Sequence, residues 1–160
     1  MKRVLFPGSF DPFHNGHLEV VERACELFDQ VVVAALRNPQ KNDPLFTLSE
    51  RQEMIEEALE HLPTVEIVVV STLVVDVAKQ VGASAIVKGL RAVSDFENEL
   101  QMAQMNRQLS GIDTLFIPTS SEHSFIASRL LREVVHFGGD VTSLVPPPVA
   151  VRLKKVIVDG

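Results

Sequence analysis

Short runs of apolar and β-branched residues alternate with amphipathic patterns of helical period along most of this chain, and this alternation limits the fold more than any other feature. The run 31–36 is apolar at every position, as in a strand buried on both faces. The segment before it places Leu18, Val21 and Cys25 three or four positions apart, which indicates one apolar helix face. The expected strands are residues 3–6, 31–36, 65–70, 85–88 and 114–117, and the expected helices are residues 17–28, 47–61, 73–81, 94–109, 126–136 and 148–156.

Strands that alternate with helices predict an α/β fold, because each helix carries the chain back to start another parallel strand. We therefore expect a Rossmann-like five-stranded parallel sheet with helices on both faces. Capping boxes at residues 47–50 and 94–97 are expected to begin two of the helices. With 160 residues, the chain is expected to form a single domain over 1–160, with about 145–160 as a C-terminal helical extension.

The polar residues that could carry chemistry follow the expected strands. In parallel sheets, ligands bind beyond the carboxyl ends of the strands, near the point where the strand order reverses. The corresponding segments are residues 7–17, 37–41, 89–91 and 119–128, and they hold most of the unusual polar residues. We expect a binding site at that edge of the sheet.

Composition excludes several classes of function. A formal net charge of −6 argues against a general nucleic-acid-binding protein, since such proteins neutralise phosphates with Lys and Arg. The apolar runs are all shorter than the roughly 20 residues of a membrane span, and the N-terminal residues do not have the pattern of a signal peptide. A single cysteine fits a reducing compartment. We expect a cytoplasmic protein with no nucleic-acid or membrane partner.

The segment after the first expected strand, residues 7–17, matches neither the dinucleotide-binding nor the P-loop glycine pattern. It is still a strand-to-helix turn, and a helix N-terminus with free N–H groups binds anions readily. His14 and His17 lie three positions apart at that helix start, so both can face one anion. Asp11 alone is a poor third ligand beside them, and we expect no metal ligands from the protein.

Residues 8–12 (Gly-Ser-Phe-Asp-Pro) and 14–17 (His-Asn-Gly-His) resemble the (T/H)-x-G-H signature of the nucleotidyltransferase superfamily. The segments 38–51, 87–106 and 124–128 extend the likeness in the same order, and the second of them is the most specific. Together they resemble the phosphopantetheine adenylyltransferase family over residues 2–147, nearly the whole chain. The resemblance implies transfer of an adenylyl group from ATP to 4′-phosphopantetheine, giving dephospho-coenzyme A and pyrophosphate. It also implies Mg²⁺ bound with ATP, possible feedback by coenzyme A, and a homohexamer.

The resemblance assigns roles residue by residue. It implies that His17, Lys41 and Arg91 are catalytic, with His17 stabilising the α-phosphate in the transition state and Arg91 holding the β- and γ-phosphates. ATP is expected to contact Ser9, Phe10, His17, Gly89, Leu90, Arg91, Glu99, His123, Ser124, Phe125, Ile126, Ala127, Ser128 and Arg129. Phosphopantetheine is expected to contact Ser9, Lys41, Val74 and Lys88, with Leu73 beside Val74 along the pantetheine arm. The chemistry needs no general base, since a phosphate monoester is already largely dianionic at pH 7.

Four positions depart from the commonest pattern of that family. His14 stands where Thr is more frequent, Lys88 where Arg is, and Ala127 and Arg129 where small hydroxyl residues are. Arg129 could add a phosphate ligand, whereas Lys88 keeps the charge but loses the bidentate fork of Arg. Two alternatives stay open: a nucleotidyltransferase with another acceptor, such as nicotinamide mononucleotide or glycerol 3-phosphate, and a non-catalytic nucleotide or coenzyme A sensor. Local roles also stay open, with Arg91 paired to Asp95 or Glu97 and Ser128 as a helix cap.

Overall fold

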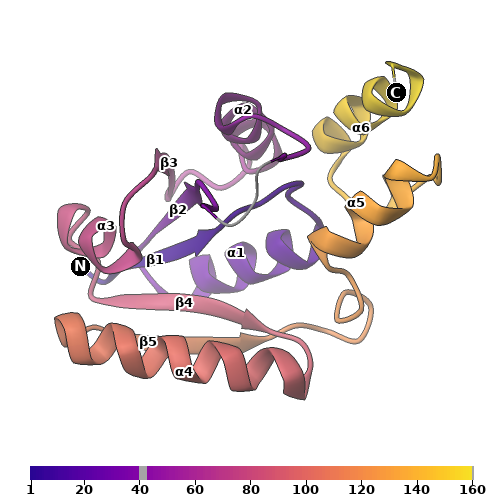
Figure 1. Cartoon of the computed structure of the whole chain (residues 1–160). Helices are drawn as coiled ribbons and strands as arrows, with labels where there is room; N and C mark the ends of the chain where they lie inside the picture. Colours follow the sequence, from indigo (N-terminus) through magenta and orange to yellow (C-terminus); the bar gives the residue numbers. More distant parts are fainter. Residues whose placement is uncertain (40–42, 160) are drawn as a thin grey trace.

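A computed structural model describes residues 1–39 and 43–159, and within them five parallel strands form one sheet in the order β3-β2-β1-β4-β5 (Figure 1). The strands are β1 (Arg3–Gly8), β2 (Gln30–Leu36), β3 (Val65–Val70), β4 (Ala85–Leu90) and β5 (Asp113–Pro118). The helices are α1 (Asn15–Leu27), α2 (Leu48–Ala58), α3 (Val74–Gln80), α4 (Val93–Ser110), α5 (Ser128–His136) and α6 (Pro147–Asp159), with a 3₁₀ turn, η1 (Thr142–Leu144), before α6. The expected fold class is confirmed.

The two faces of the sheet are buried by different helices because successive strand residues point to opposite sides. In β1, Val4 and Phe6 join a core cluster with residues of α1, α2, α5 and α6, while Leu5 between them joins a second cluster with α3. The central strands are therefore apolar at every buried position, as the sequence pattern predicted.

One of the two helix starts predicted from a capping box is found in the structure. The expected capping box opens α2: the Glu50 N–H donates to Thr47 Oγ1 at 3.1 Å, and the Thr47 N–H donates to Glu50 Oε2 at 3.2 Å. The second expected box, over residues 94–97, is wrong, because α4 already begins at Val93 and its N-cap is Ala92.

The chain order places a site between β1 and β4. The connections from β1 run outward to β2 and β3, and the chain then returns to the other side of β1 as β4 and continues to β5. Loops that follow β1 and β4 therefore diverge at the same edge, which is where a ligand is expected in such sheets.

The C-terminal helix packs against this framework. Val149 and Leu153 of α6 are fully buried, in the cluster that also holds residues of α2 and α5 (Figure 1). Among the described residues, no helix is both long and apolar enough to span a bilayer.

Candidate active site

A cavity of about 490 Å³ opens at the carboxyl ends of β1 and β4, between the N-termini of α1 and α5. It brings together most of the residues that the sequence proposed for ATP and the phosphates: Ser9, Phe10, His17, Lys88, Gly89, Arg91, Glu99, Ser124, Phe125, Ala127, Ser128 and Arg129. These residues come from four separate segments of the chain. The topology has gathered them at one edge of the sheet.

Other predicted residues lie elsewhere. Leu90, His123 and Ile126 stand outside the lining of this cavity, and Ile126 is buried in the core. Val74 borders a separate, mainly apolar cavity of about 730 Å³, together with Leu73. Lys41 lies outside the described residues.

The turn after β1 is shaped by an aromatic side chain folded back on a glycine. A methyl group at Gly8 would lie 2.8 Å from Cζ of Phe10, so only glycine leaves room for that ring. Phe10 itself has φ 50°, an uncommon backbone conformation for a residue with a side chain, and its ring packs edge-on against His17. Ser9 is thereby left at the mouth of the cavity while Phe10 is buried beneath it.

His14 and His17 form a stacked pair at the start of α1, with ring centroids 3.6 Å apart. Nδ1 of His14 accepts the N–H of Gly16 at 3.0 Å and caps the helix, and Nδ1 of His17 accepts the N–H of His14 at 3.1 Å. Each Nδ1 is therefore an acceptor, and the proton of each neutral ring lies on Nε2. His17 is left with an Nε2–H donor in a cavity that also holds Lys88 and Arg91.

Both imidazoles are neutral at ordinary pH. Burial, with smaller contributions from Arg91 and His123, lowers the pKa of His14 from 6.5 to about 3. Burial, followed by the charges of His14, Arg91 and Lys88, holds the pKa of His17 well below its ordinary value. His17 therefore offers a phosphate a fixed neutral N–H donor and not a positive charge.

The cations of the cavity are held in place by acidic partners. Lys88 Nζ lies 3.6 Å from Oε1 of Glu99, so two of the predicted site residues form an ion pair. Arg91 pairs through Nε with Asp95 at 3.1 Å, which is one of the local roles left open by the sequence, and Nη1 also donates to the Ile126 carbonyl at 2.5 Å. Arg91 thus links the β4–α4 connection to the loop before α5.

The start of α5 forms another side of the cavity. Ser128 is the first residue of that helix, and its hydroxyl donates to the Pro12 carbonyl at 2.9 Å, so the side chain ties α5 to the turn after β1 and does not cap the helix. The N-cap position is Ala127, which supplies no side-chain hydrogen bond. Backbone N–H groups at this helix start, with Arg129 beside them, face a cavity suited to an anion.

Two arginines near the site, Arg132 and Arg51, were missed by the sequence analysis. Arg132 lines the main cavity and donates through Nη1 to the Asp11 carbonyl at 2.7 Å. Arg51 of α2 is buried and donates through Nη1 to the Ser9 carbonyl at 2.7 Å, and Arg37 follows β2 beside it. Their contacts cross 42 to 121 positions of sequence, so no local pattern could have revealed them.

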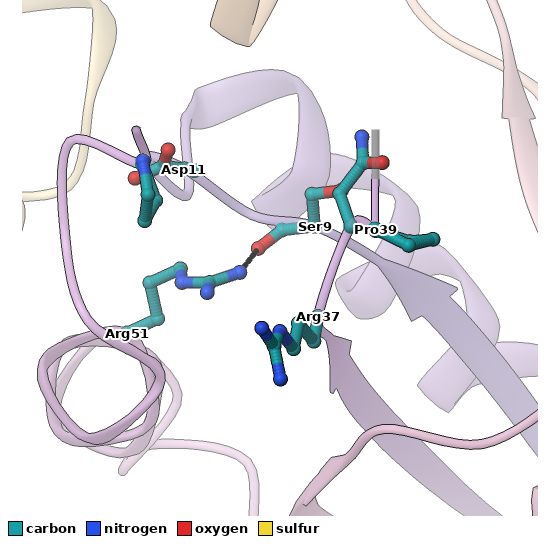
Figure 2. A pocket seen from close by; sticks show the side chains of 7 residues that line it. Ser9, Asp11, Arg37, Pro39 and Arg51 are labelled. Carbon is teal, nitrogen blue, oxygen red and sulfur yellow. Dashed lines mark hydrogen bonds between the residues drawn. The ribbon is translucent and has the colours of Figure 1, made fainter. Parts of the chain in front are cut away.

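Figure 2 shows the smaller cavity, of about 250 Å³, that Arg37 and Arg51 share with Ser9 and Asp11. The Asp11 carboxylate accepts the N–H groups of Leu45 and Phe46 at 2.9 and 2.8 Å, which anchors the start of α2 to the turn after β1. Asp11 is therefore a structural acceptor. Among the described residues, no three His, Cys, Asp or Glu side chains gather as a metal site.

The fold, with a cavity that gathers cations and N–H donors for phosphate groups at the carboxyl ends of its central strands, indicates a nucleotidyltransferase. Residues 5–134 match the family described as cytidylyltransferase-like, and the chain belongs to this family. It is also 47% identical over 156 residues to the phosphopantetheine adenylyltransferase of Alkaliphilus metalliredigens (strain QYMF), which covers 97% of this chain and 99% of the relative. The expected membership of the phosphopantetheine adenylyltransferase family is thus confirmed.

Solved structures show the same fold at lower identity. A bifunctional NMN adenylyltransferase/ADP ribose pyrophosphatase from Francisella tularensis, crystallised with AMP and a Mn ion, matches with a TM-score of 0.72 and 20% identity over 99% of this chain and 51% of that one. A lipopolysaccharide core biosynthesis protein from Thermoplasma volcanium GSS1 matches with a TM-score of 0.55 and 25% identity over 75% of this chain and 97% of that one.

Proposed function

We propose that this nucleotidyltransferase moves the adenylyl group of ATP to 4′-phosphopantetheine, releasing pyrophosphate and forming dephospho-coenzyme A. The observation that carries the proposal is the single cavity in which the Nε2–H of His17 meets Lys88, Arg91 and the start of α5. Such a cavity can hold two anions next to each other. The 47% identical relative, named for this reaction, supports the choice of acceptor.

In the proposed reaction, a phosphate oxygen of phosphopantetheine attacks the α-phosphorus of ATP. The new P–O bond forms as the bond from the α-phosphorus to the bridging oxygen of pyrophosphate breaks, and the electron pair leaves with pyrophosphate. No proton has to be removed from the attacking dianion. The protein's task is to hold the reactants in line and to stabilise the charge that develops around the α-phosphorus.

His17 suits the α-phosphate because its donor is fixed before the substrate arrives. The hydrogen bond from the His14 N–H sets the tautomer, and the stacked rings hold the orientation. A preorganised N–H in a site shielded from water stabilises developing negative charge without reorganisation. We propose that Arg91, Arg129 and the N–H groups at the start of α5 hold the departing pyrophosphate.

Ser9, Lys41 and Lys88 are proposed to hold the phosphate of phosphopantetheine, with Glu99 fixing the position of Lys88 and reaching the ATP site beside it. The pantetheine arm then extends past Val74. Val74 lines a small cavity with Lys88 and Glu99 and also lines the cavity of about 730 Å³, which offers a mainly apolar channel for that arm. Leu90, His123 and Ile126, which lie outside the cavity lining, are proposed to contact ATP through their backbone.

The finer features of the proposal come from the family resemblance. We propose that Mg²⁺ arrives bound to the triphosphate of ATP and neutralises part of its charge, with no ligands from protein side chains. We also propose one nucleotidyltransferase domain over 1–160, with 145–160 as its helical extension, a cytoplasmic location, and inhibition by coenzyme A.

A homohexamer is proposed on the same basis, and exposed apolar side chains on two helices support association between copies. Leu100, Met102, Met105 and Leu109 are exposed on α4, and Leu130 and Val134 are exposed on α5. Large exposed apolar side chains that gather into a patch mark contact sites in soluble proteins, and Met102, Met105 and Leu109 are spaced to lie on one side of α4.

The test is pyrophosphate release from the purified protein, measured with each acceptor in turn. We expect release with ATP and 4′-phosphopantetheine, loss of release when EDTA removes Mg²⁺, and little release with nicotinamide mononucleotide, with glycerol 3-phosphate, or with CTP in place of ATP. Faster release with another acceptor would assign the chain to that reaction. Tight ATP binding without turnover of any acceptor would favour a sensor.

A further inference from the structure

One side of the main cavity is a loop that connects β5 to α5, and we call residues 119–127 the wall loop. Thr119, Ser124, Phe125 and Ala127 of this loop line the cavity directly. A loop at this place has no strand or helix of its own to fix its shape. Its shape must come from contacts with neighbouring elements.

The strongest such contact comes from Glu19, in the second turn of α1. Its carboxylate accepts the N–H of Ser120 at 2.9 Å on Oε1 and at 3.1 Å on Oε2, and it accepts the Ser120 hydroxyl at 3.2 Å. Oε2 also accepts Nδ1–H of His123 at 2.9 Å. One side chain therefore holds two loop residues that lie about one hundred positions away in the sequence.

Backbone hydrogen bonds connect Ser120 and His123 to the rest of the wall loop. The Ser120 carbonyl accepts the N–H groups of His123 and Ser124, and the His123 carbonyl accepts the N–H of Ile126. Arg91 holds the far end of the loop by donating to the Ile126 carbonyl. The wall loop is thus fixed at one end by α1 and at the other by the β4–α4 connection.

The Glu19 carboxylate is ionised and largely shielded from water. Its side chain is 17% exposed, and that of His123 is 28% exposed. Burial alone would raise the pKa of Glu19, but the hydrogen bonds from His123 and Ser120 outweigh it and lower the pKa below its ordinary value. Hydrogen bonds to an ionised, partly buried acceptor are among the stronger ones in proteins.

We propose that Glu19 is a positioning residue for the nucleotide, which sets the wall loop in the shape that receives ATP by holding Ser120 and His123. Glu19 does not touch the reacting phosphates. Helix α1 then serves the reaction twice, with His17 in its first turn and Glu19 in its second. The inference rests on the proposed function in taking ATP as the ligand of this cavity.

The test is binding of MgATP to Glu19→Gln, measured by titration calorimetry in the absence of any acceptor. Gln keeps the length of the side chain but loses the charge and one acceptor oxygen, so we expect the dissociation constant to rise about tenfold. In steady-state assays, the KM for ATP should rise by the same factor, while kcat and the KM for phosphopantetheine stay unchanged. Glu19→Asp, which keeps the carboxylate, should recover part of the affinity.

Glu22→Gln is a matched control, because Glu22 lies one turn further along α1 and pairs with His61 Nε2 at 3.0 Å, outside the cavity. This variant should bind ATP like the parent. His123→Ala should weaken ATP binding, and adding Glu19→Gln to it should weaken binding by less than the two separate effects combined.

Unchanged ATP binding in Glu19→Gln would overturn the proposal. Equal loss of affinity for both substrates, with a lower melting temperature than Glu22→Gln shows, would also overturn it, because it would indicate a general structural role. If the parent binds ATP but turns over no phosphopantetheine, the proposed function fails while the calorimetry still decides the role of Glu19.

Discussion

At the scale of single residues, the site depends on imidazoles that stay neutral among cations. His17 lies with Lys88 and Arg91 in one cavity, and both cations oppose its protonation. The backbone N–H of His14 occupies Nδ1 of His17, so the only proton that the ring offers is on Nε2. A neutral donor at this place attracts the α-phosphate less strongly in the ground state than a cation would. Its advantage is that its orientation is already set.

Replacing His17 tests whether catalysis depends on a neutral N–H donor at this position or on a positive charge. We expect His17→Ala to lower kcat by about 10²–10³-fold, as when one preorganised donor is removed from an oxyanion site. His17→Gln, whose amide N–H can replace Nε2–H, should be faster than the Ala variant, and kcat of the parent should show no ionisation of this ring near its ordinary pKa of 6.5. Activity that is restored by His17→Lys and not by Gln would contradict the neutral-donor role.

At the scale of elements, the position of α1 relative to β4 brings His17 and Lys88 to one cavity. The contact that fixes this distance is between Gly89 of β4 and Val20 of α1: a methyl group at Gly89 would lie 3.0 Å from Val20 Cγ2. The sequence analysis assigned Gly89 to close approach of the nucleotide, and the structure shows that it also lets α1 approach the sheet. A larger residue would press the helix away from the strand.

We expect Gly89→Ala to destabilise the protein by about 1–2 kcal/mol, as overpacked core positions do. The same change should cost less in a Val20→Ala background, where the methyl group has room, and urea denaturation of the four proteins gives this comparison. At an unstrained position, Gly→Ala stabilises by about 0.4–1 kcal/mol through the unfolded chain. A gain in stability in the parent background would therefore show that the helix and strand are not in tight contact.

The elements also show how far the sequence could predict the site. The alternating patterns predicted each strand, and the rule that ligands bind at the carboxyl ends of strands predicted three segments that meet in the main cavity: 7–17, 89–91 and 119–128. The described part of the fourth segment, 37–39, meets the turn after β1 in the smaller cavity. Contacts between distant side chains could not be predicted. Glu19 and His123 lie 104 positions apart, and the sequence patterns, which assigned His123 to ATP, gave no sign of its contact with α1. The tautomer of His17 depends on where one backbone N–H points, which residue types do not reveal.

At the scale of the whole molecule, the two buried imidazoles make folding stability depend on pH. The pKa of His14 is about 3 when folded, below its ordinary 6.5, so between these values the unfolded chain binds a proton that the folded chain does not. The free energy of unfolding therefore rises with pH in this window. The contribution of His14 to stability is fully present above about pH 6.5 and is lost as pH falls toward 3. His17 contributes in the same direction.

This dependence can be separated from that of the carboxylates by replacing His14. Thr is a good N-cap residue, so His14→Thr should keep the start of α1 while removing one group that protonates only on unfolding. Between pH 6.5 and 5, where most carboxylates stay ionised, the parent should lose about 1 kcal/mol per pH unit more than this variant, because one proton is worth about 1.4 kcal/mol per unit at most. Urea denaturation at several pH values measures both slopes. Equal slopes would mean that His14 is protonated to the same extent in the folded and unfolded chains, and its Nδ1 would then carry a proton and could not accept the Gly16 N–H that caps α1.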